Sequence, residues 1–217
     1  MRNFVRASVL LLALVLSEPV LAGPLEDANA AYGKEDYATA LRLFRPLADQ
    51  GGASAQFMLG FMYDNGEGVP KDYVQAAKWW RLAADQGDAR AQFNLGLMYD
   101  VGQGVPKDYV QAVKWYRLAA DRGYARAQFN LGLMYDVGLG VPQDYAQAVK
   151  WYRLAADRGY ARAQFNLGFS YSKVRKATRV CQKMAEIRRF NDFRPPFYLA
   201  FPEPDFGVPI RRYAGAS

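Results

Sequence analysis

Residues 91–123 read A-Q-F-N-L-G-L-M-Y-D-V-G-Q-G-V-P-K-D-Y-V-Q-A-V-K-W-Y-R-L-A-A-D-R-G, and this stretch decides the fold. Nearly the same letters begin 36 residues earlier at Ala55 and 36 residues later at Ala127, and a partial copy begins at Ala163. A fixed period of this length is typical of stacked structural repeats. We therefore expect a domain built by repetition of a 36-residue unit.

Each unit carries the signals of two helices joined by a short loop. Gly102 and Gly104 interrupt the first helix of the second copy, and Pro106 cannot lie inside a helix. Asp108 is placed to cap the next helix, because its carboxylate can accept the free backbone N–H groups there. Gly123 suits the left-handed position that follows a helix end. The pattern predicts two antiparallel helices in each unit.

The two helices differ in their apolar faces. The second helix has apolar residues on one side and Lys114, Arg117 and Asp121 on the other, which predicts an outer helix. The first helix is apolar nearly all round, with Ala91 on one side and Phe93 on the other. Such a helix is expected to lie between two neighbouring units.

The pattern A-x-x-x-L-G-x-x-Y-x-x-G-x-G-V-x-x-D-x-x-x-A-x-x-W-x-x-x-A-A-x-x-G is matched by all three full copies. It resembles the Sel1-like repeats, relatives of the tetratricopeptide repeats. The resemblance implies an all-α fold, an α-solenoid of antiparallel helix pairs wound as a right-handed superhelix. It also implies adaptor work in assembling complexes or in signalling, and exported bacterial members resemble periplasmic partners or regulators.

The repeats predict the following organisation of the chain. A capping helix pair is expected at 23–52, full repeats at 53–88, 89–124 and 125–160, and a partial repeat at 161–172. After Tyr171 the pattern stops, and helical spacing of apolar residues predicts a C-terminal capping helix at 173–190. Residues 191–217 are rich in Pro and aromatic residues and are expected to be a flexible basic tail.

The first 22 residues have the features of a secretory signal peptide. A basic start at Arg2 and Arg6 precedes an apolar run, and small residues end the segment at Ala22. A membrane anchor is the alternative, but the run is shorter than the roughly 20 residues that span a bilayer. We expect cleavage near Ala22 and a periplasmic or secreted product with no transmembrane segment.

Charge and composition argue against several classes of function. The net charge is +7, yet residues 23–172 hold 16 Lys and Arg against 16 Asp and Glu, so the basic excess lies in residues 173–217, with 10 Lys and Arg against 4 Asp and Glu. A nucleic-acid-binding surface is therefore not expected on the repeats. Histidine is absent and Cys181 is the only cysteine, which removes common metal ligands and general bases. No cofactor and no metal site are expected.

Amide side chains recur on the predicted inner helix and are the candidate partner-binding residues of the concave face. Each could donate to and accept from the backbone of an extended peptide. The alternative is that they satisfy backbone groups between helices. The candidates are Gln92, Asn94, Gln128, Asn130, Gln164 and Asn166.

Two other repeated sets are more simply explained by structure. Carboxylates at Asp64, Asp100 and Asp136 could suggest glycoside hydrolysis, but one per unit places them on the order of 10 Å apart with no distinct acid nearby. The tryptophans at 79, 115 and 151, with Tyr116 and Tyr152, could form a stacking platform, but their position predicts burial in the core.

The second and third full copies differ at three positions only, 103/139, 107/143 and 110/146. Catalysis needs neighbouring groups in unlike environments, whereas like units suit a repeated binding surface. The sequence therefore predicts a non-enzymatic protein-binding scaffold with an unidentified protein partner. The alternatives are a hydrolase acting on a cell-wall or antibiotic substrate and a truncated, non-functional array. The tail could dock on a partner or an anionic surface, be inert, or be a remnant of a longer array.

Overall fold

The computed structural model describes residues 23–192, so the predicted signal peptide and nearly all of the predicted tail lie outside the described residues. The described residues form nine helices and no strand. Two compact units divide the chain, Met1–Tyr171 and Ser172–Ser217. The helices are α1 (Pro24–Gly33), α2 (Tyr37–Asp49), α3 (Ala53–Asn65), α4 (Tyr73–Asp85), α5 (Ala89–Val101), α6 (Tyr109–Asp121), α7 (Ala125–Val137), α8 (Tyr145–Asp157) and α9 (Ala161–Asp192).

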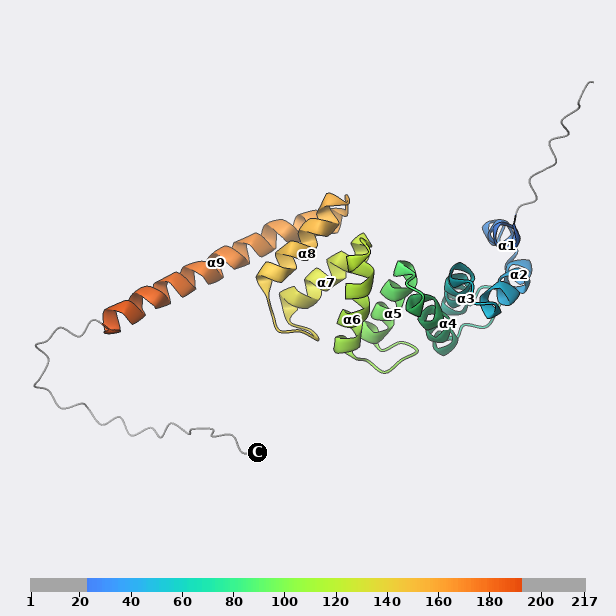
Figure 1. Ribbon diagram of the computed structural model, residues 1–217, viewed down its shortest axis with the longest axis horizontal. Helices are drawn as coiled ribbons and strands as arrows, with labels where there is room; N and C mark the ends of the chain where they lie inside the picture. Colours follow the sequence, from blue (N-terminus) through green and yellow to red (C-terminus); the bar gives the residue numbers. More distant parts are fainter. Residues whose placement is uncertain (1–22, 193–217) are drawn as a thin grey trace, which may run out of the picture. The chain divides into compact units, whose positions relative to one another are not determined.

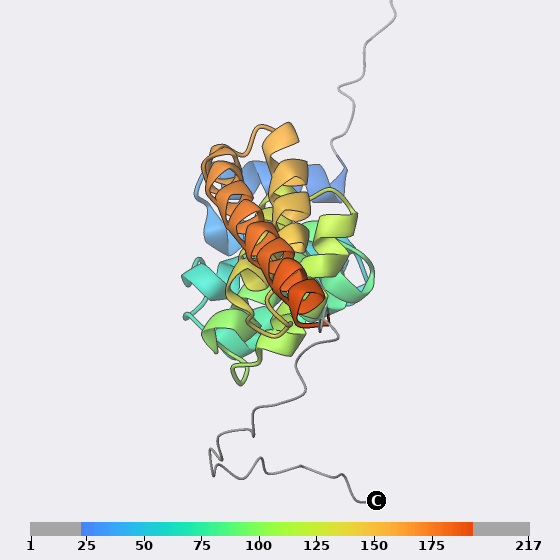
Figure 2. The same ribbon diagram turned by 90° about the vertical axis from the view of Figure 1, so that its left-hand side faces the viewer.

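Within the first unit, helices α1 to α8 form four pairs that stack in chain order (Figure 1). Each helix packs against the next one along the chain, so every pair contacts its neighbour through α2 and α3, α4 and α5, or α6 and α7. Figure 2 shows the same stack turned by 90°. The all-α solenoid of helix pairs is thus confirmed. We call α3, α5 and α7 the inner helices and α4, α6 and α8 the outer helices.

The predicted helix boundaries are confirmed by their caps. The Asp108 carboxylate accepts the backbone N–H groups of Val110 and Gln111 at 2.9 and 3.1 Å, and Asp72 and Asp144 do the same for their helices. Gly123 has a φ of +84°, in the left-handed region. These residues fix where each outer helix starts and stops, which keeps the units in register.

Each inner helix is covered on two sides, as the sequence predicts. On α5, Ala91, Leu95 and Met98 join a core cluster with the preceding outer helix α4. Phe93, from the other side of α5, joins a cluster with its own outer helix α6. Neither cluster can form within one helix pair, so the stability of each unit depends on its neighbours.

The outer helices insert an aromatic ring at the glycine of each inner helix. A Cβ placed on Gly96 would lie 2.6 Å from the Tyr116 ring, and one on Gly132 would lie 2.7 Å from the Tyr152 ring. In the first full repeat Trp80 takes this place against Gly60. The missing side chain lets the rings approach closely, which offsets the low helix propensity of glycine.

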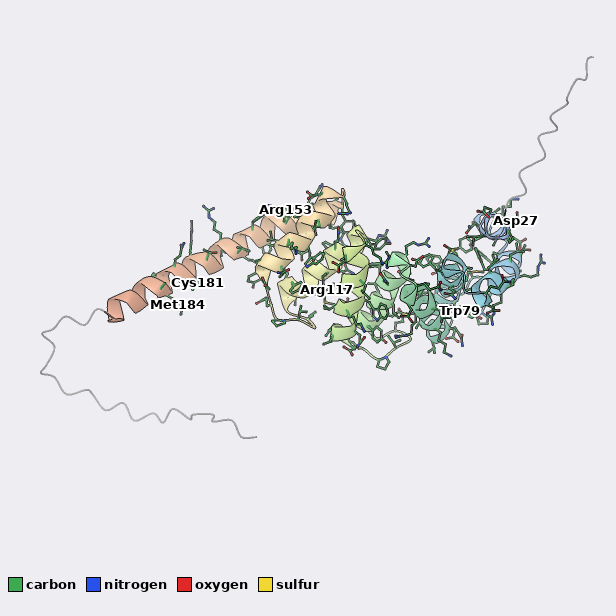
Figure 3. The ribbon with its side chains drawn as sticks, in the orientation of Figure 1. Asp27, Trp79, Arg117, Arg153, Cys181 and Met184 are labelled. Carbon is green, nitrogen blue, oxygen red and sulfur yellow. The ribbon has the colours of Figure 1, made fainter. Side chains whose placement is uncertain are left out.

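Trp115 and Trp151 lie in the core, with 5% of each side chain exposed, and Tyr116 and Tyr152 are fully buried. The prediction that these residues are core and not a stacking platform is confirmed. Trp79, labelled on α4 in Figure 3, is only half-buried. Its ring lies under the Arg45 guanidinium. Its neighbour Trp80 is the buried tryptophan of that repeat, because it occupies the position of Tyr116.

The expected separate capping helix at 173–190 is wrong. These residues continue α9, which runs from Ala161 to Asp192, because S-K-V-R-K replaces the Gly and Pro residues that end the inner helices. Phe165 and Phe169 at the start of α9 are 81% and 63% exposed. Within residues 23–192, no outer helix follows α9 to cover this face.

Candidate functional site

Two equivalent hollows lie between successive inner helices. The first has a volume of about 240 Å³ and the second also of about 240 Å³. Phe61, Asp64, Trp80, Asn94, Leu97, Met98, Val101 and Gln103 line the first. Asp100, Asn130, Leu133, Met134, Val137 and Leu139 line the second, each 36 residues after a residue of the first. The repeat therefore reproduces one site along the stack.

Each hollow combines two polar groups with an apolar wall. Asp64 and Asn94 supply a carboxylate and a carboxamide to the first hollow, and Asp100 and Asn130 supply them to the second. Val101 and Val137 stand at the edges, with 65% and 57% of their surfaces exposed. Such a site can accept a peptide group or a polar side chain and shelter an adjacent apolar one.

The predicted asparagines occupy this inner-helix face, where Asn94, Asn130 and Asn166 are all half-buried. The Asn130 side chain hydrogen bonds to the Tyr116 hydroxyl, which donates to Asp100 at 3.2 Å. Trp80 takes the tyrosine position before Asn94 and donates instead to the Phe57 carbonyl oxygen at 3.1 Å, so this contact does not extend to Asn94. Asn130 is held by the unit before it. That contact fixes the carboxamide and limits the rotamer entropy it would lose on binding a ligand.

The predicted glutamines do not share this face, and the partner-binding assignment of Gln92 and Gln128 is wrong. Both are buried, and their Nε2 atoms donate at 3.0 Å to the carbonyl oxygens of Ala84 and Ala120. These carbonyls lie in the last turn of an outer helix, where they also accept the backbone N–H groups of Gly87 and Gly123 at 2.9 Å. Gln164 is exposed at the start of α9.

Burial sets the ionisation of two groups around the hollows. It raises the pKa of the Tyr116 hydroxyl far above its ordinary value, and the negative charge of Asp100 raises this pKa further. Burial also raises the pKa of Asp64, against the opposing effect of the Lys71 ammonium. The effect of burial on the Asp64 pKa is larger than that of Lys71, because the carboxylate is partly removed from water and no ion-pair partner is close enough to compensate.

The raised pKa of Asp64 makes a pH-dependent prediction. The folded state holds the Asp64 proton more tightly than the unfolded state, so the ionised carboxylate costs stability as pH rises above its ordinary pKa of 3.8. Asp64→Asn is expected to raise the melting temperature at pH 7, and the gain should disappear below pH 3.8. Melting followed by circular dichroism at several pH values measures this. A lower melting temperature of the variant at pH 7 would contradict it.

The three repeated carboxylates are not brought together. Asp64 lies in the first hollow and Asp100 in the second, while Asp136 is near Tyr152 in the third full repeat. Within residues 23–192, no group of three or more His, Cys, Asp or Glu side chains is arranged to hold a metal ion. In the same range, no helix has the length and apolar character needed to cross a membrane.

A row of Arg and Tyr contacts, missed in the sequence, joins outer helices to the following inner helices. Arg81 donates to the Tyr99 hydroxyl, and Arg117 donates to the Tyr135 hydroxyl. Figure 3 shows Arg117 and Arg153, which belong to this row on α6 and α8. The constant separation of 18 residues between Arg and Tyr could have indicated these contacts. They fix neighbouring units together and are not available as a binding site.

The sequence also missed the apolar wall of the hollows, formed in part by Leu97 and Val101. One signal was present, because position 103 is among the few differences between the repeats. Gln103 lines the first hollow and Leu139 takes its place in the second. The two sites therefore have the same layout but different chemistry at one edge.

Comparison with known proteins places these features in a family. The model of the Sel1 repeat matches residues 29–52, 53–88, 89–124, 125–160 and 161–173. A Sel1 repeat protein from Oxalobacter formigenes is 39% identical, with a TM-score of 0.65 over 68% of this chain and 60% of that one. The protein c5321 is described as a protective antigen of uropathogenic Escherichia coli with an SLR fold. It is 42% identical, with a TM-score of 0.67 over 69% of this chain.

The chain matches only part of each of these structures, 60% of the first and 33% of the second. No curated protein matches it.

Proposed function

The chain belongs to the Sel1 repeat family, whose members are generally protein-interaction scaffolds, and we propose that it binds a protein partner along the inner-helix face. The observation that carries this proposal is the pair of equivalent hollows, each with a carboxylate, a carboxamide and an apolar wall. A single deep pocket would suit a small molecule, whereas a repeated shallow site suits a chain that crosses several units.

The spacing of the hollows favours an extended segment of the partner. Equivalent positions of stacked units lie on the order of 10 Å apart. An extended chain advances about 3.3 Å per residue, so roughly every third residue of the partner would face a hollow. The Asn94 and Asn130 carboxamides can pair with its backbone, while Leu97 and Leu133 contact its side chains.

The two hollows would select different side chains. Phe61, Trp80 and Gln103 give the first an aromatic wall and a polar edge, while both hollows carry a carboxylate. Leu139 makes the same edge of the second hollow apolar. We propose that the partner segment places a polar or cationic residue at the first hollow and an aliphatic residue at the second.

A non-enzymatic, regulatory or assembly role in the periplasm or secreted space completes the proposal. The separation of Asp64 from Asp100 supports a non-catalytic role, because glycoside hydrolysis needs two carboxylates across one bond. The basic and apolar features of residues 1–22 support export. Fractionation of the cells and N-terminal sequencing of the mature chain would test export, with Gly23 as the expected first residue.

Site-specific photo-crosslinking tests the binding face. A photoreactive residue at Val101 or Val137 samples the two hollows, and one at Val110 on α6 is a matched control with 62% of its surface exposed. In the cells that produce the protein, one partner is expected to crosslink from both hollow positions and not from Val110.

The same crosslinks should weaken at least tenfold when Asn94 and Asn130 are both changed to Ala, because two backbone contacts are lost. Asn29→Ala in α1 is a control for the amide change at an exposed position. Equal crosslinking from Val110, or crosslinks that survive the double substitution unchanged, would show that the partner binds elsewhere.

A further inference from the structure

Among residues 23–192, one more inner helix carries the surface that receives an outer helix than there are outer helices to cover it. The sequence A-R-A-Q-F-N-L-G occurs unchanged at residues 89–96, 125–132 and 161–168. In the first two positions it begins α5 and α7, and in the third it begins α9. The first two are covered by α6 and α8, while α9 is the last helix of the described residues.

The covered copies show what this surface accepts. The rings of Tyr116 and Tyr152 lie against Gly96 and Gly132 and contact the preceding phenylalanines, with ring centroids 5.9 Å apart for Phe93 and Tyr116. Each ring lies between two alanines of its helix, four residues before and three after, and all of these alanines are fully buried. The alanines are Ala76, Ala83, Ala112, Ala119, Ala148 and Ala155.

In the described part of the chain, the third copy of the surface has no outer helix over it. Nothing lies within 4 Å of a Cβ placed on Gly168, where the equivalent glycines meet an aromatic ring. Phe165 is 81% exposed, whereas its equivalents Phe93 and Phe129 are 7% and 5% exposed. Phe169 beside it is 63% exposed. The face thus offers a notch between two exposed rings, with the composition of a packed interface.

We propose that the face of α9 formed by Phe165, Gly168 and Phe169 binds an amphipathic helix of a partner protein with the pattern A-x-x-x-[Y/W]-x-x-A. The aromatic ring of that helix fills the notch at Gly168, and its alanines allow the two helices to approach closely. This site lies on the last repeat of the first unit and is separate from the hollows of the inner-helix face.

The preceding repeats favour this occupant over others. A helix is required because each equivalent surface is covered by one, and the interface at α9 continues the series. A second copy of this chain is a poor donor, because its own helices of this pattern have Tyr116 and Tyr152 fully buried. Their release would expose the core of the donor chain. The proposed occupant is therefore a helix of a different protein.

A peptide with the sequence of α8 tests the site in the full chain. The probe is a peptide of residues 144–158 in which Ala146→Glu is joined to the Lys150 side chain by a lactam. These two positions are exposed in the protein, so the link leaves the buried face of the helix unchanged. The link favours the helical conformation. Fluorescence anisotropy of the labelled peptide is expected to show saturable binding to one site. The matched peptide with Tyr152→Ala is expected to bind at least tenfold more weakly.

Substitutions in the protein place the binding at the notch. Gly168→Ala is expected to weaken binding at least tenfold, because a Cβ at this position meets the incoming ring, as at Gly96. The free protein should fold normally, since the added Cβ has open space. Gly33→Ala in α1 is the matched control, because nothing lies within 4 Å of that position either. It is expected to leave binding unchanged.

Three results would overturn the proposal. One is the absence of saturable binding by the linked peptide to a folded chain. Another is binding that Gly168→Ala leaves intact but that Asn94→Ala with Asn130→Ala removes, which would assign the peptide to the inner-helix face. The third is a dimer of the chain in sedimentation that Gly168→Ala dissociates, which would make a second copy the occupant.

Discussion

Replacing Trp115 with alanine is expected to lower the free energy of unfolding by about 3–5 kcal/mol. The indole is 5% exposed and joins the core cluster that binds α4, α5 and α6 into adjacent units. Its removal leaves a cavity between units that the helices cannot close without losing other contacts. The Arg81 guanidinium, 5.7 Å from the ring centroid, also loses its partner.

The variant Trp115→Phe separates the effect of the cavity on stability from the effect of the buried indole N–H group. The Trp115 Nε1 is buried without an acceptor in the protein, so its loss removes an unsatisfied donor while an aromatic ring remains. We expect a smaller cost, roughly 1–2 kcal/mol. Urea unfolding followed by circular dichroism compares the two variants with the parent chain. An alanine variant with the midpoint of the parent would show that Trp115 is not part of the core.

Replacing Gly104 with alanine is expected to destabilise the fold by about 2–5 kcal/mol, because two costs add. Gly104 has a φ of +69°, a conformation that alanine adopts at a cost of roughly 1–2 kcal/mol. A Cβ at this position would also collide with the carbonyl oxygen of Tyr73, the first residue of α4. Because that oxygen belongs to a helix backbone, the loop between α5 and α6 must move away from the preceding unit.

Gly159→Ala isolates the first of these costs. Gly159 has a φ of +78°, but nothing lies within 4 Å of a Cβ placed there. We therefore expect it to lose only the roughly 1–2 kcal/mol of the left-handed conformation. Chemical unfolding of both variants under the same conditions gives the difference. Equal losses would mean that the loop yields easily and that the contact with Tyr73 does not matter.

The repeat was predictable because its determinants are local. Asp108 and Gly123 mark helix ends through contacts within a few residues, and the apolar period of each helix indicates which sides are buried. These features predicted the helix pairs, their stacking and the burial of Trp115. They did not predict that Trp79 is only half-buried while its equivalents Trp115 and Trp151 are buried, because its burial depends on the first helix pair, which differs in sequence from the full repeats.

The candidate site was predicted only in part. The asparagines lie on the inner-helix face, whereas Gln92 and Gln128 bind backbone carbonyls of the preceding outer helix. Glutamine and asparagine offer the same donors and acceptors, so composition could not separate their roles. The tertiary structure separates the two roles. Gln92 and Gln128 each lie within hydrogen-bonding distance of a carbonyl oxygen at the end of the preceding outer helix, eight residues earlier in the chain.

The sequence by itself determined the period, the helix pairs and the solenoid, because caps, breakers and amphipathic spacing act over a few residues. Tertiary structure alone decided which side chains line the hollows, which amides satisfy buried carbonyls, and that no helix of the described residues lies over the notch at Gly168. The physical reason is that identical segments acquire different surroundings from the helices beside them. Phe129 and Phe165 have the same local sequence, yet one is buried and the other is exposed, because α8 covers the first and no helix of residues 23–192 covers the second.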